Sequence, residues 1–77
     1  MALLFYKREP CDLCDKALRL IIEGGLSDRV ELVNIDEDLD LIQRYGDQVP
    51  VVRNDETGEK LAWPFTASQV RELAGVD

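Results

Sequence analysis

The stretch FYKREPCDLCDKALRLII, residues 5–22, contains the only two cysteines of the chain, Cys11 and Cys14. The apolar run Ala2–Tyr6, bounded by charged residues, predicts a buried strand just before them. Apolar residues at positions i, i+4, i+7 and i+8 predict one face of a helix just after them, made of Leu13, Ala17, Leu20 and Ile21. The cysteine pair is therefore expected where the first strand meets the first turn of a helix.

The next two segments continue the alternation of strand and helix. Val30–Ile35 carries apolar residues on both of its alternating sides, which predicts a strand covered on both faces. Asp36–Tyr45 predicts a weaker helix, because Leu39 and Ile42 form one apolar stripe and acidic residues occupy the first turn. Strand, helix and strand within about 35 residues form a βαβ unit, whose strands are parallel.

The C-terminal part of the sequence predicts a β-hairpin and a final helix. The runs VPVVRN from Val49 and EKLAWPF up to Phe65 flank the turn sequence NDETG. Trp63 is expected to pack in the core or at the edge of the second of these strands. Thr66 followed by Gln69 predicts a capping box, Phe65 and Val70 have the spacing of a hydrophobic staple, and Gly75 can end the helix.

These elements give the order β-α-β-α-β-β-α. We therefore expect an α/β fold with a four-stranded mixed sheet flanked by helices, and a single domain over residues 1–77.

The composition narrows the possible partners. The net charge of −7 argues against nucleic acid, whose phosphates need clustered basic residues, and against anionic membranes. Neither a signal peptide nor a membrane-spanning run is apparent, so a cytoplasmic protein is expected. Thiols are kept reduced in the cytoplasm, so a close cysteine pair there favours catalysis or metal binding over a permanent cross-link.

The position of the two cysteines predicts their chemistry. Unsatisfied N–H groups and the helix dipole at a helix N-terminus stabilise a thiolate, which is the nucleophilic form of cysteine. Cys11, at or next to the N-cap, is expected to be exposed and to attack a disulfide. Cys14, one turn further, is expected to be shielded and to resolve the mixed disulfide.

Charged neighbours act on the Cys11 thiol in opposite directions. Lys7 and Arg8 favour the thiolate, whereas Glu9, Asp12 and Asp15 oppose it. We therefore expect the helix end to lower the pKa of Cys11, but less than in the most acidic thiols of this kind.

In its order of elements the chain resembles the thioredoxin superfamily, and most closely the glutaredoxin-like proteins. The resemblance rests on CDLC opening a helix and on QVPVV about 35 to 40 residues later. It implies a cis bond between Val49 and Pro50 opposite the cysteines, with the Val49 backbone pairing with an extended substrate. It also implies a substrate carboxylate at the backbone N–H groups of Thr66 to Ser68, with positive charge from Lys7, Arg8 or Arg44.

Two motifs depart from the glutaredoxin pattern. Asp12 and Leu13 stand between the cysteines in place of Pro-Tyr, and WPFTAS stands where the family has Gly-Gly and an acidic residue. The resemblance implies that no cofactor is bound and that glutathione is one candidate for the electron donor.

The predicted function is a thiol–disulfide oxidoreductase that reduces protein or mixed disulfides through Cys11 and Cys14. Its partners would be a disulfide-containing protein or a small thiol, with glutathione or a reductase as donor, and neither nucleic acid nor membrane. The main alternative is a non-catalytic interaction or redox-sensing module on the same scaffold. Half of a zinc site and two buried core cysteines are further alternatives, but the chain has no histidine to complete a metal site, and no metal is expected.

Overall fold

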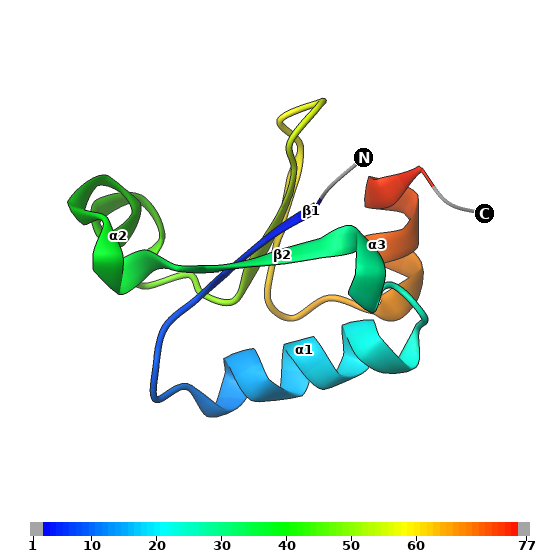
Figure 1. Ribbon diagram of the computed structural model, residues 1–77, viewed down its shortest axis with the longest axis horizontal. Coiled ribbons are helices and arrows are strands. Elements are labelled where there is room, and N and C mark those ends of the chain that lie inside the picture. The colour runs from blue at the N-terminus through cyan, green and yellow to red at the C-terminus, as the bar shows by residue number, and fades with distance from the viewer. Residues whose placement is uncertain (1–2, 76–77) are drawn as a thin grey trace.

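The computed structural model describes residues 3–75 of the chain, so Ala2, the predicted start of the first strand, lies outside the described residues. Its element order is β-α-β-α-β-β-α, as predicted (Figure 1). The strands and helices are β1 (Leu3–Lys7), α1 (Asp12–Glu23), β2 (Val30–Asn34), α2 (Leu39–Tyr45), β3 (Val51–Asn54), β4 (Lys60–Ala62) and α3 (Ala67–Ala74). Two short 3-10 turns, η1 (Ser27–Arg29) and η2 (Ile35–Glu37), precede and follow β2.

The four strands form one mixed sheet in the order β2-β1-β3-β4. Strand β1 is parallel to β2, with Leu3 opposite Val30, and antiparallel to β3, with Tyr6 opposite Val51. Strands β3 and β4 form the antiparallel hairpin. The predicted α/β fold class and its four-stranded mixed sheet are therefore confirmed.

The helices cover the two faces of the sheet unequally. Helices α1 and α3 lie on one face and α2 on the other, near the end of the sheet where β1 passes into α1 (Figure 1). The larger core cluster, between the sheet and α1 and α3, contains Leu3, Phe5, Ala17, Ile21, Leu26, Val52, Phe65, Val70 and Ala74. The smaller cluster, under α2, contains Tyr6, Ile35, Tyr45 and Val51.

The buried face of α1 differs from the prediction by one position. Leu13 is 46% exposed, whereas Cys14 is only 2% exposed and lies on the buried face with Ala17 and Ile21. Positions i, i+3 and i+7 share a helix face as well as the predicted set does. The Cys14 side chain therefore lies on the buried face of α1, where the sequence pattern predicted that of Leu13.

Helix α2 begins later than predicted. The Asp38 side chain accepts the N–H groups of Asp40 and Leu41, so the helix begins at Leu39, and the residues before it form η2. Leu39 is 77% exposed and does not belong to the apolar stripe. The predicted first turn therefore contains the helix cap, Asp38, and the residues of η2.

Three strands also differ from the prediction, β2 in how it is covered and β3 and β4 in where they begin or end. Strand β2 lies at the sheet edge, and Leu32 is 48% exposed, so this strand is not covered on both faces. Strand β3 begins at Val51 rather than Val49, and β4 ends at Ala62. Trp63 therefore follows the strand, and its ring packs edge-on against Phe65 at 5.2 Å between centroids.

Helix α3 has the predicted ends. Thr66 Oγ1 accepts the Gln69 N–H at 3.2 Å and Gln69 Oε1 accepts the Thr66 N–H at 2.8 Å, which completes the capping box. Gly75 adopts a left-handed conformation with φ of 73° and closes the helix. Within residues 3–75 no helix has the length and apolar character needed to cross a membrane.

Candidate functional site

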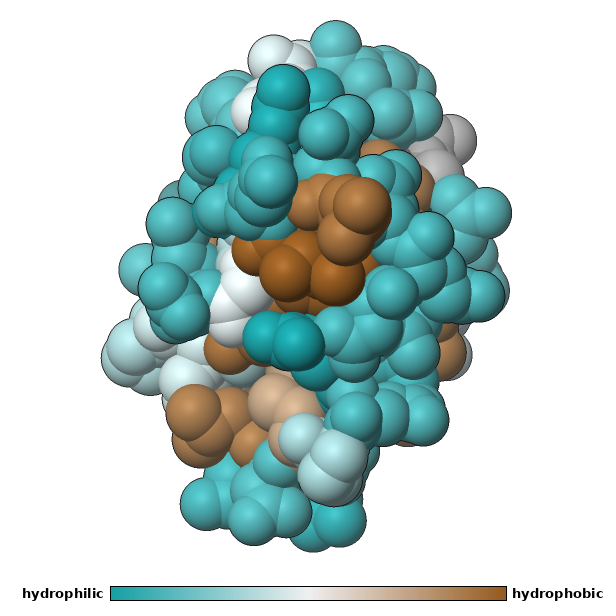
Figure 2. Space-filling view, turned by 90° about the vertical axis from the view of Figure 1, so that its left-hand side faces the viewer, coloured by the Kyte–Doolittle hydropathy of each residue, from teal (hydrophilic) through white to brown (hydrophobic). Residues whose placement is uncertain are grey.

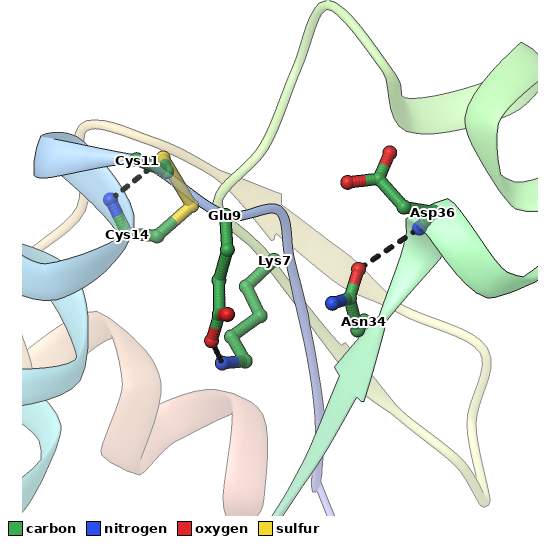
Figure 3. A network of polar contacts seen from close by, with 6 residues as sticks. All are labelled: Lys7, Glu9, Cys11, Cys14, Asn34 and Asp36. Carbon is green, nitrogen blue, oxygen red and sulfur yellow. Dashed lines mark hydrogen bonds and ion pairs between the residues drawn. A yellow bond between two sulfur atoms is a disulfide. The ribbon is translucent and has the colours of Figure 1, made fainter.

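Cys11 is the N-cap of α1. Its backbone is extended, with φ of −156° and ψ of 104°, and its Sγ accepts the backbone N–H of Cys14 at 3.1 Å (Figure 3). A sulfur thus occupies the position that a serine or aspartate oxygen usually holds at a helix start. The predicted location of Cys11 at the first N–H groups of the helix is confirmed.

Cys11 and Cys14 are joined by a disulfide (Figure 3). Their Cα atoms are 5.2 Å apart, within the usual range for bonded cysteines. Cys11 is half-buried and Cys14 is 2% exposed. An incoming sulfur therefore has better access to Cys11 than to Cys14, as expected from the sequence.

The first turn of α1 carries acidic residues beside this disulfide. Asp12 and Asp15 both lie in that turn and are exposed. Among residues 3–75 no lysine or arginine forms an ion pair with either carboxylate. Their negative charge therefore acts directly on whatever approaches Cys11.

Lys7, a predicted substrate-binding residue, is engaged within the protein. Its Nζ lies 2.6 Å from Glu9 Oε1, and Figure 3 shows the Glu9 side chain extending from beside the disulfide to this amine. The hydrogen bond from Lys7 and its positive charge lower the pKa of Glu9 below its ordinary value. The Lys7 charge is therefore compensated by Glu9.

Arg8, the second predicted cation, is also paired. Its Nε donates to Asp36 Oδ1 at 2.8 Å. Asp36 in turn donates its backbone N–H to the Asn34 side chain at the end of β2 (Figure 3). Arg8 thus connects the loop before α1 to the turn after β2, across the ends of the two parallel strands.

Pro50 lies at the same end of the central strands as the cysteines. Since Val51 pairs with Tyr6 near the end of β1, the residue before Val51 is placed where β1 leads toward Cys11. The Val49–Pro50 peptide bond is cis, as the family resemblance implied, and Pro50 is fully buried. Two further bonds that precede prolines, at Pro10 and Pro64, are also cis.

The backbone of Val49 is only partly free to pair with a substrate. Its N–H donates to the Tyr45 carbonyl at 3.0 Å, and the Pro50 carbonyl accepts the Trp63 N–H at 3.0 Å. Tyr45 also stacks on Tyr6 with 4.7 Å between ring centroids. Tyr6 is 5% exposed in this stack, so its ring is buried against α2 and is not presented at the surface near the cysteines.

Thr66, the last predicted substrate-binding residue, is likewise occupied. Its backbone N–H and its hydroxyl are both used in the capping box with Gln69. The structure thus brings Cys11 and Cys14 together and places Pro50 at the same end of the central strands. In the structure, the side chains of Lys7 and Arg8 and the backbone and hydroxyl of Thr66 form hydrogen bonds within the protein.

Sequence reasoning missed the residues that act as these internal partners. Glu9 had a weak signal, because residues two apart on an extended segment share a side. Asp36 and Tyr45 lie 28 and 39 positions from Arg8 and Tyr6 in the sequence, and no pattern joined them. Within residues 3–75 no three histidine, cysteine, aspartate or glutamate side chains are grouped to hold a metal ion.

The surface around this end of the molecule is mixed in character. Figure 2 views the side on which α2 and the start of α1 lie, and shows two apolar areas separated and bordered by hydrophilic residues. Leu13, which lies between the two cysteines in the sequence, is one of the large apolar residues that are exposed. A partner at this end would meet both apolar and charged groups.

Comparison with known proteins identifies a family and solved structures that are similar to this chain. Residues 2–73 match the family described as Glutaredoxin-like domain (DUF836). The crystal structure of a structural-genomics target, XcR50 from X. campestris, is 36% identical, with a TM-score of 0.82 and 96% of each chain covered. Its solution structure gives 37% identity and a TM-score of 0.81, covering 97% of this chain and 94% of that one.

A more distant structure shares the fold. Thioredoxin 1 from Thermosipho africanus is 20% identical, with a TM-score of 0.69 over 97% of this chain and 91% of its own. The search of curated proteins gave no significant match.

Proposed function

Because the chain belongs to the glutaredoxin-like family, we propose that it is a thiol–disulfide oxidoreductase that reduces protein or mixed disulfides through Cys11 and Cys14. The observation that carries the proposal is the Cys11 sulfur at the N-cap of α1, hydrogen-bonded to the Cys14 N–H and bonded to the more buried Cys14 sulfur. A helix start stabilises the thiolate, and the second thiol is placed to close the disulfide.

The reaction runs in two exchange steps. The Cys11 thiolate attacks one sulfur of the substrate disulfide, so that a bond forms between these sulfurs and the other substrate sulfur leaves as a thiolate. The Cys14 thiolate then attacks Cys11 Sγ, which forms the observed disulfide and releases the second substrate thiolate. Two electrons pass to the substrate, and solvent supplies the protons for its thiols.

A reduced donor must then restore the dithiol. Either two equivalents of a small thiol such as glutathione or the dithiol of a reductase can do this by the same exchange chemistry. We place this cycle in the cytoplasm, where such donors keep thiols reduced. Pro50 and the carbonyl of Val49 form the substrate side of the site in this proposal.

The decisive experiment separates the roles of the two cysteines. The reduced variants Cys11→Ser and Cys14→Ser are mixed with a model mixed disulfide, and the products are identified by mass spectrometry after acid quenching. We expect Cys14→Ser to accumulate a mixed disulfide at Cys11, and Cys11→Ser to react at least tenfold more slowly than wild type. Equal reaction at both cysteines, or none with wild type, would overturn the proposal.

A redox-sensing module without turnover is the second candidate. It is favoured by the internal engagement of Lys7, Arg8 and the Val49 N–H, which leaves fewer groups to hold a substrate. Steady-state turnover with excess donor and substrate distinguishes the two candidates. A protein that exchanges its disulfide once but does not cycle would be a sensor.

A further inference from the structure

The two cations predicted to bind substrate are both paired with carboxylates. Lys7 is paired with Glu9 at 2.6 Å, and Arg8 is paired with Asp36 at 2.8 Å. An anionic substrate would have to compete with a carboxylate for either side chain. Neither cation therefore offers uncompensated positive charge to an acidic ligand.

Three backbone donors that could bind a carboxylate are engaged too. The Thr66 N–H and the Gln69 N–H are both used within the capping box, and the Val49 N–H is donated to Tyr45. Binding an acidic peptide through these groups would require breaking existing hydrogen bonds. The loss of each such bond offsets most of the gain from the new one.

The first turn of α1, which follows Cys11, carries two acidic side chains without an ion-pair partner among residues 3–75. Asp12 is adjacent to Cys11, and Asp15 lies one residue beyond Cys14; both are exposed and lack a cationic partner within residues 3–75. The basic residues of α1, Lys16 and Arg19, lie further along the helix and line a shallow pocket that reaches Gly24 and Ala67. Neither forms an ion pair with Asp12 or Asp15.

We infer that the disulfide partner of this site is a polypeptide with basic residues beside its reacting cysteine, and that Asp12 and Asp15 set this preference. The inference rests on the proposed function and names its substrate class. In the mixed disulfide, the substrate sulfur bonded to Cys11 carries its neighbouring lysine or arginine side chains past the first turn of α1. The two carboxylates attract them there, and the same carboxylates repel the charges of an acidic tripeptide such as glutathione.

The experiment compares matched substrates. Reduced protein is mixed with two peptide disulfides that differ only in Lys or Glu on both sides of the cysteine, and with glutathione disulfide. The rate constant of each reaction is divided by that of dithiothreitol with the same substrate, which removes differences in the intrinsic reactivity of the disulfides. We expect the basic peptide to react about tenfold faster than the acidic one at low salt, and salt to reduce the difference.

The double variant Asp12→Asn/Asp15→Asn tests which charges are responsible. We expect it to lose most of the preference while still reacting with every substrate. Asp28→Asn, which removes one exposed carboxylate in η1 beyond the far end of α1, is the control and should keep the preference.

The possible outcomes separate the inference from the proposed function. Reaction with all substrates at equal normalised rates, or faster reaction with glutathione disulfide or the acidic peptide, would overturn the inference and leave the oxidoreductase intact. A preference that survives in the double variant would also overturn it. No reaction with any disulfide would instead remove the proposed function.

Discussion

The sulfur of Cys11 accepts the backbone N–H of Cys14, its own disulfide partner, at 3.1 Å. The same N–H group is available to the thiolate when the disulfide is reduced. A hydrogen bond to the charged form, together with the helix dipole, favours that form. The half-buried Cys11 and the buried Cys14 should therefore differ strongly as acids.

We predict that the pKa of Cys11 lies below the value of about 8.5 for free cysteine. The rate of alkylation by iodoacetamide is measured against pH in Cys14→Ser, which leaves a single thiol. The acidic residues of the first turn limit the shift, so Asp12→Asn should lower the pKa further.

The reciprocal variant provides the comparison. In Cys11→Ser the remaining thiol of Cys14 is buried, and burial raises the pKa of a thiol. A Cys11 pKa at or above that of free cysteine would contradict the role assigned to the helix N-terminus.

Removing the Glu9 charge should release that of Lys7. Glu9 extends from beside the disulfide to Lys7, so Glu9→Gln leaves an uncompensated cation there (Figure 3). We expect a lower Cys11 pKa and a several-fold faster reaction with glutathione disulfide. Glu59→Gln in the β3–β4 hairpin is a control with the same change of charge, and an equal effect from it would show that net charge alone is responsible.

The Lys7–Glu9 pair also predicts a pH dependence. Because Lys7 lowers the pKa of Glu9 in the folded protein, the stabilisation from this pair is present above the unfolded-state pKa of glutamate. It is lost as the pH falls through the lower, folded-state value. The carbon chemical shift of the Glu9 carboxyl, followed by NMR from pH 7 to pH 2, measures this titration.

Lys7→Met should raise the Glu9 pKa back to the ordinary value of a glutamate. An unchanged titration in that variant would show that the ion pair does not form in solution. Since Glu9 is exposed, the effect on the stability of the whole protein should be small.

The element order and the location of the cysteines were predictable because they depend on local patterns. The apolar run before Cys11, the helical periodicity after it and the capping residues around Thr66 each involve neighbours in the sequence. The family resemblance added the cis Val49–Pro50 bond, which no local pattern in this sequence indicated. Apart from the residue that begins the buried face of α1, these features agree with the structure.

The charge state of the site was not predictable, because it depends on distant partners. Arg8 was assigned to a substrate, and only the fold shows that Asp36, from the turn after β2, neutralises it. Similarly, periodicity alone allowed either Leu13 or Cys14 on the buried face of α1. The choice was made by packing against the sheet, which buries the cysteine and exposes the leucine.

The final prediction concerns the start of α3. Thr66→Ala removes the hydroxyl that accepts the Gln69 N–H, leaving one end of the capping box without a partner. We expect a loss of about 1 kcal/mol in the free energy of unfolding, the usual effect of removing such a cap. Urea unfolding monitored by Trp63 fluorescence measures it, since Trp63 packs against the core near this helix.

Ser68→Ala is the matched control, because it removes a hydroxyl of the same kind from an exposed position two residues into the helix. It should leave the stability unchanged or slightly higher, as alanine is the better helix former. Equal losses in the two variants would show that the hydroxyl of Thr66 has no special role. A loss confined to Thr66→Ala, with the rate of disulfide exchange unchanged, would assign Thr66 to the stability of α3 rather than to substrate binding.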